Sequence, residues 1–390
     1  MRLTIKERQK ATKITAARYQ KASKKKKGTI LEEFAALTGY DRCYAAYLLR
    51  GHGKKVRINR RTVAVGDIGK RRKRQRQRTY GDDVLRSLKQ IWMIMDCICG
   101  KRLQPLMKEL LRILLKHKEI RVLRETKKKL LRISASTIDR LLRQERKKYE
   151  LKGRSLTKPG TLLKHQIPIR TFSEWDEQRP GFVEIDLVGH EGGNQRGDFI
   201  QTLNVTDVCT GWTEMQAVKN KAQIWVFEAL KDIRKRLPFD LLGIDSDNGS
   251  EFINDHLVRF CREEQITFTR SRSYRKNDNC FVEQKNYTIV RRYVGYSRYD
   301  TEIAQKLLNE LYGHLRLYVN FFQPVMKLIQ KTRIGSRVRK KYDVPQTPYQ
   351  RVLVSPHVTE NKKETLRQQY AHLNPAMLRR QIAKLQNKLF

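Results

Sequence analysis

The sequence predicts a multi-domain protein, in which helical units with a helix-turn-helix pattern precede an α/β unit built on a mixed sheet. Apolar residues recur at helical spacing through much of residues 29–149, and short strand-like runs begin at residue 182. The length of 390 residues also exceeds what one hydrophobic core normally uses. These three observations favour several domains of different secondary structure.

The charge of the chain points to a polyanionic partner. Lys and Arg number 84 against 40 Asp and Glu, so the formal net charge is +44. Double-stranded DNA is the partner that such a balance favours. The longest apolar run, at 91–99, is too short for a membrane helix. We therefore expect no membrane association and a cytoplasmic location, associated with the nucleoid.

The first helical unit is expected within residues 1–60. Apolar residues at helical spacing run from Ile30 to Gly39, which breaks the pattern, and resume until Gly51. Two short helices across a Gly-containing turn are typical of DNA-reading helix-turn-helix motifs, although an ordinary helical hairpin has the same pattern. In the first interpretation the second helix presents Arg42 and Tyr44 to DNA.

A second helical unit is expected over residues 80–150. Its stretch 128–146 repeats the helix-turn-helix layout, with Ser136 as the expected cap of the second helix and Asp139 completing a capping box. The side chains expected to face a DNA groove are Thr137, Arg140 and Arg143.

Two segments without apolar periodicity are interpreted as linkers. Residues 61–79 contain the basic run "GKRRKRQRQR", which should follow a phosphate backbone when DNA is present, although such a run is often only a solvated segment. Residues 151–174 include "KGRSLTKPG", whose glycines and proline indicate a domain boundary.

From residue 175 the pattern changes to strands alternating with helices. "FVEIDLVGH" at 182–190 alternates with a period of two, which predicts a strand with Asp186 on its polar side. Two further strands follow around a turn that holds Asp207, which we interpret as a turn residue rather than a catalytic one. The predicted order is three strands, helix, strand, helix, strand, helix, which is a mixed sheet covered by helices.

Three carboxylates fall at strand ends or on the polar faces of this sheet. Asp186 lies on the first strand, Asp247 ends the fourth, and Glu283 lies one turn into the last helix; 60 and 35 residues separate them in turn. Hard oxygen ligands of this kind suit Mg²⁺. Two such ions can hold the attacking and leaving oxygens of a phosphoryl transfer.

Residues 175–325 resemble the integrase catalytic core of retroviral integrases and bacterial insertion-sequence transposases. The matching motifs are "EIDLVGH", "SDNGSEF", "NCFVEQKNYTIVRRY" and "YVNFFQP". The resemblance implies an RNase H-like fold with a D, D-35-E triad of Asp186, Asp247 and Glu283 as catalytic residues and metal ligands. It further implies two Mg²⁺ ions, for which Mn²⁺ can substitute, and a homo-oligomer acting on DNA.

The pair of aspartates in "IDSDNGSEF" is assigned through the same resemblance. The family ligand directly precedes Asn-Gly, and the spacing of 35 to Glu283 also favours Asp247 over Asp245. Asp245 is expected to tune the site or to end the strand. Asn248 is expected to contribute side-chain hydrogen bonds to the turn. His190 could polarise a water or phosphate, or could be a turn residue.

Two departures from the family pattern concern DNA contacts and the end of the core. Tyr287 and Val290 stand where retroviral integrases carry lysines, and Gln323 replaces an arginine of the ending motif. Basic residues that could contact DNA instead, or form a solvated basic face, are Lys285, Arg291 and Arg292. Residues 326–390 are expected to form a basic DNA-contacting region whose fold the sequence does not define.

The expected function is that of a DNA transposase or integrase that binds element ends, cleaves DNA and joins 3′-hydroxyl ends to target DNA. The alternative from another class is a catalytically inactive, transposase-derived DNA-binding regulator. A plain nuclease of the same fold would not need two helix-turn-helix units.

Overall fold

The structure is a computed structural model that describes residues 3–57, 63–66, 79–149, 178–246, 255–270 and 280–390. It divides into two units, Met1–Arg78 and Thr79–Phe390. The second unit contains the predicted second helical segment, the predicted sheet and the C-terminal region together.

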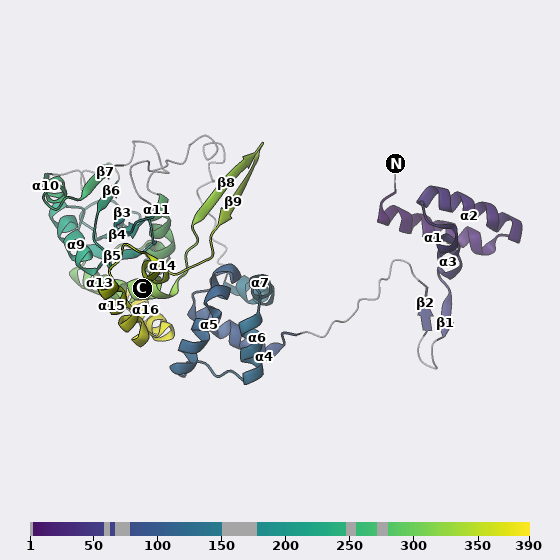
Figure 1. The fold of residues 1–390 in the computed structure, drawn as a ribbon, viewed down its shortest axis with the longest axis horizontal. Coiled ribbons are helices and arrows are strands. Elements are labelled where there is room, and N and C mark those ends of the chain that lie inside the picture. Colours follow the sequence, from purple (N-terminus) through teal and green to yellow (C-terminus); the bar gives the residue numbers. More distant parts are fainter. Residues whose placement is uncertain (1–2, 58–62, 67–78, 150–177, 247–254, 271–279) are drawn as a thin grey trace. The chain divides into compact units, whose positions relative to one another are not determined.

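The first unit is a three-helix bundle followed by a short hairpin (Figure 1). Its helices are α1 (Ile5–Lys21), α2 (Lys24–Thr38) and α3 (Arg42–Gly51), which bury Phe34 and Leu49 in a common core. Gly39 ends α2 with a φ of 67°, a conformation that favours glycine. Asp41 caps α3 by accepting from the Cys43 and Tyr44 amides.

The hairpin corrects one prediction from the sequence. Strands β1 (Lys55–Arg57) and β2 (Val63–Val65) pair antiparallel, so β2 lies inside the segment 61–79 that was interpreted as a linker. Three-residue strands show almost no periodicity, which is why the pattern did not reveal them.

The second unit begins with a group of helices. The buried face of these helices includes Trp92, Leu111 and Ile138. Ser134, not the predicted Ser136, caps α7, because its hydroxyl accepts from the Thr137 amide. Asp139 instead accepts from the Gly100 amide and Arg146, so the predicted capping box is wrong. The helices are α4 (Asp82–Ile94), α5 (Gly100–Lys116), α6 (Arg124–Arg132), α7 (Ala135–Leu141) and α8 (Arg143–Tyr149).

A five-stranded mixed sheet follows, in the order β5-β4-β3-β6-β7. The central strand β3 pairs antiparallel with β4 and parallel with β6; β4 pairs antiparallel with β5, and β6 pairs parallel with β7. The predicted mixed sheet flanked by helices is therefore confirmed. The strands are β3 (Phe182–Gly189), β4 (Gln201–Asp207), β5 (Thr213–Val218), β6 (Gly243–Ser246) and β7 (Thr267–Arg270).

Helices connect and cover these strands (Figure 1). Helix α9 packs on β4 and β5, and the long helix α13 packs on β5 and on the C-terminal helix α16. Asp207 accepts from the Gly181 and Thr210 amides, which confirms its turn role. The helices are α9 (Gln223–Arg236), α10 (Asp255–Glu263), α11 (Cys280–Lys285), the π-helix η2 (Asn286–Arg291), α12 (Arg292–Val294) and α13 (Glu302–Phe322).

The C-terminal region has two parts. A hairpin of β8 (Leu328–Ile334) and β9 (Arg337–Tyr342) extends away from the sheet and helices (Figure 1). Helices α14 (Pro348–Val354), α15 (Glu360–His372) and α16 (Pro375–Leu389) then return to the body and join its core. None of the described helices is long and apolar enough to cross a membrane.

One continuous core holds the second unit together. It includes side chains of α4 and α5, of the sheet and of α13 and α16. Tyr318 and Gln323 from α13 and its C-terminus donate to the carbonyls of Ile94 and Met95. The buried Gln323 thus joins the end of α13 to the loop between α4 and α5.

Candidate active site on the central strand

Asp186 lies half-buried in the middle of β3, where an amide network orients it. Its Oδ2 accepts from Asn286 Nδ2 at 2.5 Å, and Asn286 Oδ1 accepts from Asn204 Nδ2 at 2.7 Å. Asn204 stands directly opposite Asp186 in the register of β3 and β4. Asn286 therefore joins the helix that follows β7 to the aspartate on the central strand.

Glu283 lies on that same helix, three residues before Asn286, and its side chain is exposed. Residues three apart share one face of a helix, so Glu283 and Asn286 neighbour each other. The start of the helix is held by the buried Glu184, whose Oε2 accepts from the Phe281 and Val282 amides at 2.9 and 2.8 Å. The start of α11 and the residue directly after it, Asn286, are thereby both tied to β3.

Glu184 and Asp245 form a buried acidic pair across β3 and β6. They are partners in the strand register, and neither side chain is accessible. The pKa of Glu184 is raised to about 8, first by burial and then by the nearby charges of Asp245 and Glu283, while the two helix amides oppose the rise. Asp245 Oδ1 accepts from Thr269 on β7. The three carboxyl groups are thus close enough to interact electrostatically.

Asp247 and Asn248 lie outside the described residues, so the structure places two of the three predicted metal ligands. In the part of the chain that is described, no three His, Cys, Asp or Glu side chains gather as a metal site. Two buried oxygens near the carboxylates, Asn204 Oδ1 and Glu184 Oε1, have no hydrogen-bond partner among the described residues. Carboxylates beside such acceptors are a donor set that fits a hydrated Mg²⁺.

His190 is fully buried and belongs to a separate hydrogen-bond chain. Its Nε2 lies 2.8 Å from Thr202 Oγ1, which in turn lies 2.6 Å from the Tyr312 hydroxyl. Burial, together with the nearby charge of Arg291, lowers the pKa of His190 to about 3. The imidazole is therefore neutral, and its ring packs edge-on against Tyr299 with 5.5 Å between the ring centroids.

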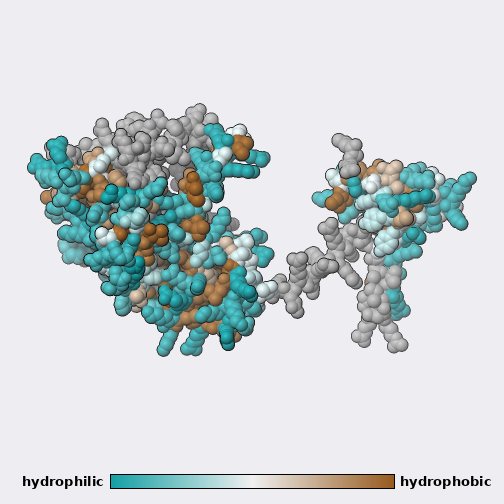
Figure 2. Space-filling view, in the orientation of Figure 1, coloured by the Kyte–Doolittle hydropathy of each residue, from teal (hydrophilic) through white to brown (hydrophobic). Residues whose placement is uncertain are grey.

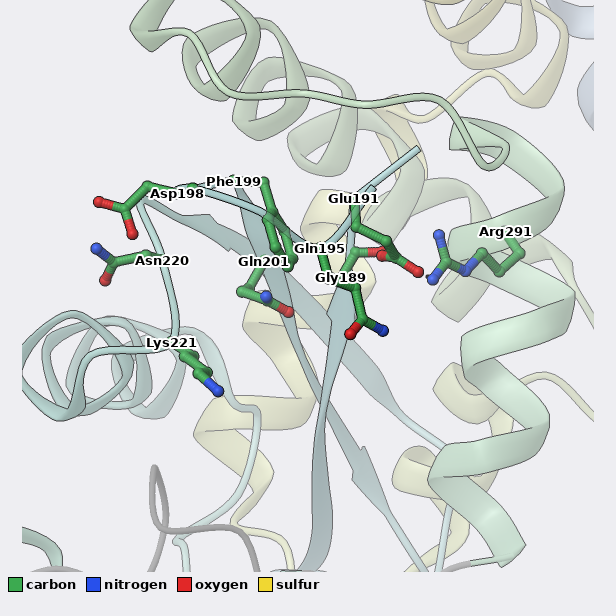
Figure 3. Close-up of a pocket in the computed structure, with 10 residues that line it drawn as sticks. Gly189, Glu191, Gln195, Asp198, Phe199, Gln201, Asn220, Lys221 and Arg291 are labelled. Atoms are coloured by element: carbon green, nitrogen blue, oxygen red, sulfur yellow. Dashed lines mark hydrogen bonds between the residues drawn. The ribbon is translucent and has the colours of Figure 1, made fainter. Parts of the chain in front are cut away.

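Of the three basic residues near Glu283, Lys285 is buried, and Arg291 and Arg292 make contacts within the chain. Lys285 is buried, and burial lowers its pKa to about 7. Arg291 donates to the Gly189 carbonyl at 2.7 Å, and Arg292 donates to the Asp96 carbonyl and pairs with its carboxylate. Arg291 also borders a pocket of about 440 Å³, where it points toward Glu191 from its helix (Figure 3).

The candidate DNA-reading residues lie on α3 of the first unit and on α7 and α8 of the second unit. Arg42 and Tyr44 are exposed on α3, where Arg42 makes only a surface pair with Glu32. Arg140 and Arg143 are exposed near α7, and Thr137 is half-buried. With Arg146 and Lys147, these arginines line a basic hollow of about 580 Å³.

Two residues of the site were not predicted to have these roles. Asn286 could have been found from its position three residues after Glu283, on the same helix face. For Glu184, nothing local in the sequence shows that a distant helix begins against it.

The second unit belongs to the class of α/β folds. Its mixed sheet is flanked by helices, and a helix that carries a carboxylate is tied to the central strand. The chain is similar to solved retroviral integrase cores. The HTLV-2 integrase catalytic core domain in complex with magnesium is 15% identical and covers 38% of this chain and 93% of that chain, with a TM-score of 0.27. The catalytic core domain of BIV integrase is 16% identical and covers 49% of this chain and 98% of that chain, with a TM-score of 0.30.

A full-length relative places the chain in a family. This chain is 39% identical over 350 residues to the uncharacterized protein y4rM of Sinorhizobium fredii (strain NBRC 101917 / NGR234). The match covers 90% of this chain and 96% of that protein. The chain therefore belongs to the same protein family as y4rM. No protein-family profile matches the chain.

Proposed function

We propose that the chain is a DDE-type DNA transposase of an insertion sequence. In this proposal it binds element ends, cleaves DNA and joins 3′-hydroxyl ends to target DNA. The observation that carries the proposal is the Asn286 bridge, which ties the Glu283 helix to Asp186. A helix bearing a carboxylate is held against a strand bearing another, in a chain whose charge favours DNA.

The metal ligands in this proposal are Asp186, Asp247 and Glu283. The parallel register of β3 and β6 pairs Ile185 with Ser246. Asp186 follows Ile185 on β3, and Asp247, which lies outside the described residues, follows Ser246 in the sequence. When bound, two Mg²⁺ ions would neutralise charge on the attacking and leaving oxygens of a phosphoryl transfer; Mn²⁺ would be an alternative.

The remaining residues of the site hold these ligands in place. Asn286 fixes the Asp186 carboxylate by its hydrogen bond, and Glu184 fixes the start of the Glu283 helix. In the first step a water oxygen bonds to phosphorus, the P–O3′ bond breaks and the released oxygen takes up a proton. In the second step that 3′-hydroxyl attacks a target phosphodiester, and the target's own 3′-oxygen leaves. Positioning and charge neutralisation account for the protein's share of this chemistry.

DNA recognition is assigned to the exposed helices. We propose that α3, through Arg42 and Tyr44, and α7, through Thr137 and Arg140 with the adjacent Arg143, lie against DNA as helix-turn-helix readers. Arg291 and Arg292 already make hydrogen bonds within the chain. The residues of α3 and α7 are therefore better placed to contact a duplex. Two element ends must be handled together, which suits a homo-oligomer on DNA.

The triad is tested by isosteric substitutions in a cleavage and joining assay. Asp186→Asn, Asp247→Asn and Glu283→Gln should each abolish activity with Mg²⁺ or Mn²⁺ while duplex binding persists, because each removes ligand charge with little change in volume. Asp245→Asn is the matched control and should keep measurable activity. The substrates are duplexes taken from the inverted repeats that flank the reading frame.

Two outcomes would contradict the proposal. Activity in Asp247→Asn together with its loss in Asp245→Asn would show that the wrong aspartate was assigned. A wild-type chain that binds the ends but neither cleaves nor joins DNA with either metal would be the inactive regulator.

A further inference from the structure

The β8–β9 hairpin, residues 328–342, is a projecting element without a core of its own. All seven residues of β8 and five of the six of β9 are exposed. An isolated two-stranded ribbon is at best marginally stable in water. Figure 2 shows that hydrophilic side chains dominate the visible surface of the body from which the ribbon extends. The ribbon therefore contributes little to the hydrophobic core of the unit.

The base of the ribbon is nevertheless firmly attached. The Lys327 amide donates to Asp343 Oδ1 at 2.7 Å, and Arg351 of α14 donates to Asp343 Oδ2 at 2.6 Å. Val325 and Gln346 form a bridge just below. These contacts fix both strands at the point where they leave the body of the unit. The ribbon is therefore an arm that is anchored at its base.

The charge of the ribbon has one sign. Between Leu328 and Tyr342 the sequence contains no Asp or Glu. Lys331 and Lys340 stand directly opposite each other in the register, an arrangement that destabilises an isolated ribbon. The six cations of the two strands are Lys331, Arg333, Arg337, Arg339, Lys340 and Lys341.

These cations occupy both faces of the ribbon. Because cross-strand partners share a face and side chains alternate along each strand, Lys331 and Lys340 lie on one face, and Arg337 and Arg339 on the other. A second copy of this chain, itself strongly basic, is a poor electrostatic partner for such an arm. A duplex groove has phosphates along both of its walls, and the major groove admits a two-stranded ribbon.

We propose that the β8–β9 ribbon is a DNA-binding arm that lies in a groove of duplex DNA. The inference rests on the proposed function, which identifies the polyanion as DNA. Within the basic C-terminal region, it assigns DNA contact to the β8–β9 ribbon alone. Helices α14 to α16 bury apolar residues in the core instead. The arm adds a DNA contact apart from the two helix-turn-helix candidates.

The test compares two double substitutions on the ribbon with one elsewhere, in the full chain. Lys331→Gln with Lys340→Gln alters one face, and Arg337→Gln with Arg339→Gln alters the other. Lys384→Gln with Lys388→Gln removes the same charge from exposed positions on α16 and is the matched control. Binding to a random-sequence duplex is measured against salt concentration in EDTA, so that no cleavage is needed.

Each ribbon variant should reduce the steepness of the log affinity against log salt plot by about 1.8, which corresponds to two phosphate contacts. At about 0.1 M salt this means a roughly ten- to hundredfold loss of affinity. The control should leave the slope unchanged. Because the substituted residues are exposed, thermal unfolding should be the same for all four proteins.

Three results would overturn the inference. Equal slopes for the ribbon variants and the control would show only a general charge effect. A changed slope for one face alone would exclude placement in a groove. A smaller oligomer by light scattering with an unchanged slope would show that the ribbon binds a second copy. None of these results depends on cleavage, so failure of the proposed catalysis is distinguished by the triad assay.

Discussion

Glu184 shows how one buried side chain can position a carboxylate, that of Glu283, which lies almost a hundred residues away in the sequence. Its Oε2 accepts from the Phe281 and Val282 amides, which are among the orphan donors of a helix start. Glu283 follows directly on that helix turn. A small movement of the helix start would displace the Glu283 carboxylate, although Glu184 itself need not contact a metal or DNA.

Glu184→Ala should therefore lower both stability and activity, and Glu184→Gln should restore most of each. Alanine leaves two buried amides without an acceptor, at a cost of about 1–3 kcal/mol in the free energy of unfolding, whereas glutamine keeps an acceptor oxygen of the same reach. Urea unfolding and metal-dependent cleavage are measured on the same preparations. If the glutamine variant is as inactive as the alanine variant, the charge of Glu184 has a direct role instead.

At the scale of elements, the helix that carries Glu283 is irregular where it meets Asp186. The sequence predicted one helix from about residue 279, but the structure has α11, then a π-helix, then α12. Asn286, the first residue of the π-helix, makes the bridge to Asp186. Short π segments inside α-helices are frequent at functional sites, and local propensity does not predict them.

A second contact between elements joins the loop after α5 to the final helix. Glu119 receives hydrogen bonds from Arg380 of α16 and from Asn374, the cap of that helix. Arg380 and Asn374 lower the pKa of Glu119 to about 2. Because the folded-state pKa lies below the ordinary value, this stabilisation is present above about pH 4.5 and is lost as the pH falls toward 2.

Glu119→Gln should consequently be less stable than the wild type at pH 6 to 7, and the difference should shrink below about pH 4.5. Urea unfolding at several pH values measures it. Glu125→Gln is the control, because Glu125 pairs with Lys128 on the exposed surface, where an ion pair contributes little to stability. A pH-independent difference would mean that lost packing, not the ionised contact, causes the effect.

At the scale of the whole molecule, the boundary between separable parts lies at residue 78. Residues 79–149 share a hydrophobic core with the sheet. Tyr318 and Gln323 also donate hydrogen bonds to backbone carbonyls at the end of α4. A cut after residue 155 would expose this shared apolar surface. A cut after residue 78 removes a unit with its own core.

Residues 79–390 alone should fold and retain metal-dependent attack on DNA, with weaker preference for element ends. The fragment keeps the proposed ligands and loses the base contacts of α3, each worth about 1–3 kcal/mol, so discrimination against scrambled duplex should fall about tenfold or more. Residues 156–390 should aggregate or unfold. Circular dichroism and cleavage of end and scrambled duplexes compare the two. Full end preference in the longer fragment would move recognition to α7 or to the ribbon.

The sequence by itself determined the features that depend on periodicity and on short motifs. The order of strands and helices, the turn at Asp207 and the positions of Asp186 and Glu283 on their elements follow from local patterns, because alternation and helical spacing record which face of an element is buried. The candidate triad also came from the sequence, through motif and spacing, and Asp247 remains a prediction.

Only the tertiary structure decided the features that depend on residues far apart in the chain. The Glu184 cap, the Asn286 bridge, the burial of Lys285 and the shared core of residues 79–149 all join segments that no local window contains. Burial and hydrogen bonding are set by what packs against a side chain. A polar residue on a strand therefore has the same local pattern whether it faces solvent, a metal or the start of a distant helix.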